Sequence, residues 1–184
     1  MEIHSIKRIL LILFTGALFT GISTSCLKMK PNGTKSAAKY YETFFVGEEG
    51  TQYFVKPIKF SNNEDEILTL DITFRYKDQV KDSATITFSF FSEDLIKKID
   101  SISLSNKNIF LKSHKVDLMF NERDKGLIES RFSSKILLSD MVKLFNSSDW
   151  TMQLYSSEKS YTIVSNKKTN KIIDALNFDI FTLF

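Results

Sequence analysis

Very few residues in this chain are of a type that could carry out covalent or metal chemistry. Cys26 is the only cysteine, and the two histidines are His4 and His114. One cysteine cannot form an intramolecular disulfide. With a single histidine after Cys26, the chain cannot build a metal site from several histidines there. We therefore expect neither a metal site nor a bound cofactor.

The carboxylates offer one route to catalysis. Asp117, Glu122 and Asp124 follow His114 closely in the sequence, and a fold that gathered them in one cleft could raise the pKa of a carboxyl for acid–base work. The chain lacks the G-x-S-x-G and S-x-x-K motifs, a phosphate-binding loop and a dinucleotide-binding glycine pattern. We expect a protein that is not an enzyme, and keep an exported hydrolase built on these residues as an alternative.

Two further polar groups have simple interpretations. The stretch "NNEDE", 62–66, contains Asn63 and Asp65, whose oxygens could form a weak calcium site, but its spacing matches no EF-hand loop. We expect solvated turn residues there. Asp71 and Arg75 share the polar side of one predicted strand, which suggests a surface salt bridge between them.

The first 26 residues have the order of a secretory signal peptide. Lys7 and Arg8 precede an apolar run from Ile9 to about Leu18, and small or hydroxyl residues lead to Cys26. The apolar run is shorter than the roughly 20 residues of a membrane-spanning helix. A cysteine that directly follows a small residue at the predicted cleavage point resembles the lipobox of bacterial lipoproteins.

This resemblance implies that residues 1–25 are a signal peptide and that Cys26 is acylated, with palmitate as one acyl group. The acyl chains would hold the protein on a membrane of the bacterial cell envelope, the outer membrane in a Gram-negative host. An acylated cysteine has no thiol to oxidise, which explains a single cysteine in an exported chain. Secretion with a free thiol and an uncleaved anchor are the alternatives.

After the anchor, composition divides the chain into a short linker and one domain. Residues 26–35 are polar and include Pro31 and Gly33, which predicts a lipidated flexible tether. Residues 36–184 are rich in phenylalanine, and we expect them to fold as a single β-rich globular domain.

The charge of the chain argues against a nucleic-acid surface. The formal net charge is +3, and removing the leader, with Glu2, Lys7 and Arg8, leaves about +2. Short basic clusters occur at 96–100, "IKKID", and 166–171, "NKKTNK". We interpret both as solvated lysines at the ends of elements.

From Thr51 onward, apolar and polar residues alternate as in half-buried antiparallel strands. The alternating segments are 67–76, 83–90, 101–105, 115–120, 150–155 and 161–165. In 115–120 the pattern places Val116, Leu118 and Phe120 on the buried side. Polar turns are expected at 61–66, 77–83, 121–126 and 156–159. The fold class is mainly β, an antiparallel meander or a two-sheet β-sandwich with two or three short packed helices.

Helical spacing of apolar residues occurs in four places. Residues 36–47 predict a short docked helix, and Ser92–Ile99 predict one turn capped by Ser92. A firmer helix follows Ser139 as its N-cap, with Met141 in its apolar face. The tail predicts a helix from about Lys168, and its last residues also alternate as in a strand. The aromatic segment 40–46 and the tail either pack on the domain or form exposed patches.

These observations favour a membrane-anchored, noncatalytic lipoprotein that acts as a binding, interaction or structural module. Its partner could be a protein, a glycan or a lipid, and the sequence selects neither among these nor an oligomeric state. A carrier of a small ligand or lipid, with phenylalanines lining a cavity, is a further alternative besides the hydrolase.

Overall fold

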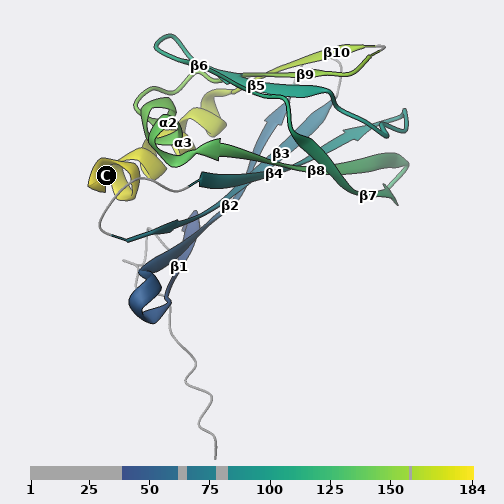
Figure 1. The fold of residues 1–184 in the computed structure, drawn as a ribbon. Coiled ribbons are helices and arrows are strands. Elements are labelled where there is room, and N and C mark those ends of the chain that lie inside the picture. Colours follow the sequence, from purple (N-terminus) through teal and green to yellow (C-terminus); the bar gives the residue numbers. More distant parts are fainter. Residues whose placement is uncertain (1–38, 62–65, 78–82, 158) are drawn as a thin grey trace, which may run out of the picture. The chain divides into compact units, whose positions relative to one another are not determined.

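Antiparallel β-strands make up most of the protein, as the alternating pattern predicts (Figure 1). The computed structural model describes residues 39–61, 66–77, 83–157 and 159–184, which belong to one unit, Pro31–Phe184. The strands are β1 (Tyr41–Phe45), β2 (Thr51–Ser61), β3 (Ile67–Tyr76), β4 (Ser83–Ser92), β5 (Ser101–Ser105), β6 (Phe110–Ser113), β7 (Val116–Asp124), β8 (Leu127–Leu137), β9 (Thr151–Tyr155) and β10 (Ser160–Val164). The mainly β fold class with a few short packed helices is therefore confirmed.

The strands form one sheet that nearly closes on itself. Their order is β6-β5-β9-β10-β2-β3-β4-β8-β7, and β1 pairs with β2 beside this path. The two end strands, β6 and β7, are consecutive in the chain and are joined through His114 and Lys115. Beside this connection, the Ser134 hydroxyl of β8 lies 2.8 Å from Oγ of Ser113 and 2.7 Å from the carbonyl oxygen of Lys115.

The hydrophobic core lies on the inner side of the sheet. On β3, Leu68, Leu70, Ile72 and Phe74 are buried, and the residues between them are half-buried. The largest buried side chains are Trp150, Phe60, Phe74, Phe88, Phe90, Phe132, Phe145 and Phe181. All of them come from the described ranges, so this unit contains a hydrophobic core made of its own residues.

In the part of the chain that the structure describes, two α-helices, α2 (Leu138–Phe145) and α3 (Lys167–Asp179), accompany the sheet, and both were expected from the sequence. The predicted N-cap of α2 was wrong, because the helix begins at Leu138 and no side chain caps it. Leu138 is fully buried, so packing fixes the start of this helix. No helix in the described ranges is long and apolar enough to cross a membrane.

The N-terminus of α3 is fixed by side-chain hydrogen bonds. Asn166 caps it by accepting from the backbone N–H groups of Lys168 and Thr169. The buried hydroxyl of Thr169 donates to the carbonyl oxygen of Lys59 at 2.6 Å, which joins α3 to β2. After α3 the chain forms the 3-10 turn η3 (Phe181–Leu183) instead of the alternative terminal strand.

The helix predicted for 36–47 was wrong, because residues Tyr41–Phe45 form β1. This strand pairs with the first half of β2, from Tyr41 opposite Val55 to Phe45 opposite Thr51. The 3-10 turn η2 (Gly47–Glu49) connects them, and Gly47 has a φ of +63°. The apolar residues of this segment have helical spacing, but an isolated helix of this length is barely stable in water. Pairing with β2 supplies the backbone hydrogen bonds instead.

The helical turn predicted at Ser92–Ile99 was also wrong. The Ser92 hydroxyl donates to the carbonyl oxygen of Asp94 at 2.7 Å, and residues 93–99 form no helical turn. Ile96 and Ile99 are buried and anchor this connection to the core in an irregular conformation. The helical spacing of apolar residues therefore does not decide the conformation of this segment; the burial of its two isoleucines does.

The edge strands correct three smaller predictions. Strand β6 forms at Phe110–Ser113, where no strand was expected, and β7 extends through Asp124 into the predicted turn 121–126. Between Leu118 and Phe120 the register with β8 shifts. This bulge moves Phe120 opposite Arg131, on the side away from the core, because each inserted residue reverses the alternation that follows.

The predicted salt bridge between Asp71 and Arg75 does not form. Asp71 accepts from Arg131 of β8 at 2.6 Å, and Arg75 pairs with Glu49. Four residues along a strand span about 13 Å, whereas β3 and β8 are separated only by β4, a spacing of about 10 Å that a long arginine side chain can bridge. Pairing across the sheet therefore replaces pairing along the strand.

Candidate functional site

Several residues singled out in the sequence lie outside the described residues. They are Cys26 with the leader 1–25 and tether 26–35, and Asn63 and Asp65 of the acidic stretch.

The carboxylates of the hydrolase alternative lie along one edge strand. Asp117, Glu122 and Asp124 belong to β7, and His114 precedes this strand. All four are exposed, and none lines a pocket described below. Asp117 and Asp124 are about 20 Å apart along an extended strand, so these two side chains do not converge on one substrate atom. The structure does not bring the four residues together.

One pocket in the described residues is a groove between two segments that are distant in sequence. We call it the end groove. It is lined by Asp94–Lys98 of the β4–β5 connection, by Ser156, Ser157 and Lys159 of the β9–β10 turn and by Tyr161 of β10, and has a volume of about 630 Å³. The two connections meet because β5 pairs with β9, with Ser101 opposite Tyr155.

Charges of both signs line the end groove. Lys97, Lys98 and Lys159 supply positive charge, and Asp94 supplies a carboxylate. A smaller adjoining pocket of about 210 Å³ shares Asp94, Lys159 and Tyr161 with the groove and adds the carboxylates of Glu66 and Glu93. The groove therefore offers both cationic donors and anionic acceptors within a small volume.

Lys159 lies where the two pockets meet. Its Nζ is 4.0 Å from Glu66 Oε1 and 4.8 Å from the centre of the Tyr161 ring. Tyr161 is only 6% exposed, and its ring packs on Phe90 with centroids 4.7 Å apart. A rigid ring and an adjacent ammonium form a fixed base for the groove, while the β4–β5 connection supplies its other wall.

Chemically, this arrangement is suited to binding. Among the residues that the structure describes, no group of three or more His, Cys, Asp or Glu side chains could hold a metal ion. Lysines, carboxylates and serine hydroxyls at a groove can form charge-assisted hydrogen bonds to a polar ligand. The sequence contained one sign of this site, the basic cluster at 96–100, but nothing in it placed that cluster beside Tyr161.

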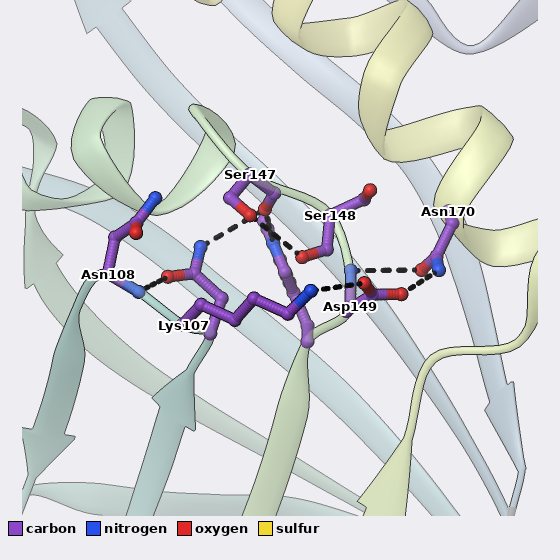
Figure 2. A network of polar contacts seen from close by, with 8 residues as sticks. Lys107, Asn108, Ser147, Ser148, Asp149 and Asn170 are labelled. Atoms are coloured by element: carbon purple, nitrogen blue, oxygen red, sulfur yellow. Dashed lines mark hydrogen bonds and ion pairs between the residues drawn. The ribbon is translucent and has the colours of Figure 1, made fainter.

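A second polar cluster holds the end of α2 in place (Figure 2). Asn106 donates to the carbonyl oxygens of Leu144 and Ser147 at 2.7 and 3.0 Å and accepts from two backbone N–H groups of its own turn. Asp149 has a φ of +66°, and its side chain meets Asn170 of α3 and Lys107. Most of these bonds satisfy backbone groups, so the cluster is a structural joint between β5–β6, α2 and α3.

The half-buried Arg131 forms a third cluster on the outer side of the sheet. Its guanidinium donates to Oδ2 of Asp71 at 2.6 Å and to Oγ of Ser89 at 2.7 Å. The three residues come from β8, β3 and β4, so the cluster ties neighbouring strands together. Arginine cannot act as a base at physiological pH, and this arrangement does not activate the serine.

Burial shifts the ionisation of two tyrosines on β1 and β2. Burial raises the pKa of Tyr53, and the nearby Tyr41 and Tyr76 raise it further. Burial likewise raises the pKa of Tyr41, with a smaller contribution from Asp179. The Tyr53 ring stacks on Phe74 with centroids 4.8 Å apart, so its shift reflects packing of the ring.

The phenylalanines that could line a carrier's cavity contact one another. Phe145 stacks on Phe181 with centroids 3.8 Å apart, and Phe88 stacks on Phe132 at 5.5 Å. Such ring contacts are typical of a filled core. The pockets described above mix charged and polar residues with a few apolar ones, and Phe91 is the one phenylalanine in their lining.

Comparisons with known proteins give no guide to the function. No protein family, no curated protein and no solved structure matches this chain.

Proposed function

We propose that this protein is a lipid-anchored, noncatalytic lipoprotein of the bacterial cell envelope, attached through Cys26, that binds a polar partner in the end groove. The observation that carries the proposal is the position of the single cysteine, directly after a signal-peptide pattern and a small residue. Two or three acyl chains, each contributing roughly 0.8 kcal/mol per buried CH₂, would hold the chain on a membrane permanently.

The end groove supports the binding part of the proposal. Its lysines and carboxylates complement a ligand that carries both charges, and its volume accommodates a few side chains of a peptide. Leu95 at the groove is 48% exposed and adds an apolar contact. We therefore expect the partner to be a protein that presents a short charged segment.

The anchor is tested by the intact mass of the protein from membrane fractions of its native host. The wild-type chain should begin at residue 26 and be heavier by its acyl chains, and a Cys26→Ser variant should be soluble or unprocessed. An unmodified mass with a reactive thiol in the soluble exported fraction would contradict the lipoprotein assignment.

The groove is tested by photocrosslinking in intact cells, with a crosslinking amino acid in place of Leu95. We expect one discrete adduct, which the additional substitutions Lys97→Glu and Lys98→Glu abolish because they reverse two of the three positive charges of the groove. The same amino acid in place of Leu137, which is 55% exposed at the end of β8, is the matched control. Equal adducts at the two positions would refute the groove as the binding surface.

A further inference from the structure

Four lysines surround a third pocket, beside the first described residues of the chain. Lys39, Lys56, Lys168 and Lys171 line it, Tyr40 and Ile172 lie between them, and its volume is about 360 Å³. We call it the lysine pocket. It forms because the hydrogen bond from Thr169 to the Lys59 carbonyl holds the start of α3 against β2.

The positive charge of the lysine pocket is largely uncompensated. Lys56 forms an ion pair with Glu42, at 3.2 Å between Nζ and Oε1. Within the described ranges, no ion pair closer than 4.0 Å joins Lys39, Lys168 or Lys171 to a carboxylate. Lys39 lies over the ring of Tyr40, 5.1 Å from its centre, which leaves the charge in place. Three cations therefore face one small surface.

The direction of α3 increases this positive potential. The first turn of α3 contains no acidic residue, and Lys167 and Lys168 occupy it instead. The N-terminal end of a helix carries a partial positive charge, so lysines there are unfavourable unless an anion is near. Lysines in the first turn of α3 lower the stability of the isolated domain, and a bound anionic ligand would offset this loss.

We infer that the lysine pocket binds the anionic phospholipid headgroups of the membrane to which the chain is attached; this inference rests on the proposed function. Its charge complements such a surface, and the apolar atoms of Tyr40 and Ile172 among the lysines suit the boundary between headgroups and acyl chains. Lys39 follows the anchor closely, because the chain from Cys26 to Lys39 can span at most about 45 Å.

This contact would leave the end groove accessible to a partner. Lys159 of the groove precedes β10, and Lys168 of the lysine pocket follows it, so the two pockets lie at opposite ends of that strand. A domain bound to the membrane through the lysine pocket would therefore present the end groove away from the bilayer.

The test uses residues 26–184 with Cys26→Ser, a mature chain without acyl groups that contains the complete core. Co-sedimentation at low salt is compared for vesicles of phosphatidylcholine alone and for vesicles that also contain phosphatidylglycerol. We expect binding only to the anionic vesicles, and its loss at high salt. Lys168→Gln with Lys171→Gln should weaken partitioning about 25-fold, since each lysine near an anionic surface contributes about 5-fold.

Lys115→Gln with Lys135→Gln is the matched control, because these exposed lysines remove the same charge and line none of the pockets described here. We expect less than a 2-fold effect from it. Equal losses from the two pairs, equal binding to both kinds of vesicle, no binding, or full inhibition by inorganic phosphate at constant ionic strength would each overturn the inference. The tested chain cannot be acylated, so failure here is distinct from failure of the lipid anchor.

Discussion

Phe178 and Phe181 lie three residues apart near the C-terminus, yet their environments are opposite. Phe178 is 79% exposed, whereas Phe181 is 1% exposed. The Phe181 ring stacks on Phe145, with centroids 3.8 Å apart, and contacts Phe74 at 5.6 Å. Truncating each residue to alanine therefore tests whether the C-terminal segment is part of the core.

The expected cost of Phe181→Ala follows from the buried surface and the space left behind. Removing the ring takes away about 100 Å² of buried apolar surface, which contributes about 2.5 kcal/mol. If the neighbours fill half of the vacated volume, a cavity of about 50 Å³ costs about 1 kcal/mol more. We expect the free energy of unfolding to fall by about 3.5 kcal/mol, and Tm by about 10 °C.

The assay is urea unfolding of residues 26–184, followed by the fluorescence of Trp150. This is the only tryptophan in the chain, it is fully buried, and its ring lies 4.6 Å from that of Phe145. Phe178→Ala is the control and should change the free energy of unfolding by less than about 0.5 kcal/mol. Equal effects of the two variants, or a cost below about 1 kcal/mol for Phe181→Ala, would refute the docking of this segment.

Three further variants test other parts of the fold by the same urea assay. Asn106→Ala should cost about 2 to 3 kcal/mol because it leaves several backbone groups unpaired, whereas Asn108→Ala should cost little; equal costs would contradict the network of Figure 2. Gly50→Ala should cost several times more than Gly126→Ala: both have positive φ, but only at position 50 does an added Cβ meet backbone, at 2.2 Å. Burial raises the Tyr53 pKa above 10.0, so the folded state keeps this proton where the unfolded chain releases it, and the resulting stability is complete below about pH 10 and lost above it. Tyr53→Phe should reduce the loss of stability between about pH 9 and pH 11, and an unchanged loss would assign it to other groups.

The alternation of apolar and polar residues along the sequence predicted the strands correctly where buried and less buried positions alternate strictly. On β3 and β4, Leu68 and Phe88 are buried at the positions that alternation gave them. Alternation gave the wrong side for Phe120, because the bulge between Leu118 and Phe120 turns this residue away from the core. It also failed at β1, because the residues that pair with Tyr41–Phe45 supply hydrogen bonds that local spacing does not reveal.

The candidate sites were less accessible to sequence reasoning than the strands. The basic clusters at 96–100 and 166–171 were both visible as lysines at the ends of elements. Their neighbours were not, because Lys97 and Lys159 line one pocket, and Lys168 and Lys39 another, only through the pairing of distant strands and the docking of α3. Charged residues along the chain indicate the sign of the charge on a surface. They do not indicate how deep a pocket is there or which other segments line it.

The sequence by itself determined the mainly β class, the positions of both α-helices and the prediction of a lipid anchor at Cys26, since each depends on residues that are close together in the chain. Only the tertiary structure decided that Asp71 pairs with Arg131 and that two pockets exist at opposite ends of β10. The physical reason is distance. Adjacent strands of a sheet lie about 5 Å apart and next-but-one strands about 10 Å apart whatever their separation in the chain, so partners and pockets are set by strand order, which alternation alone does not specify.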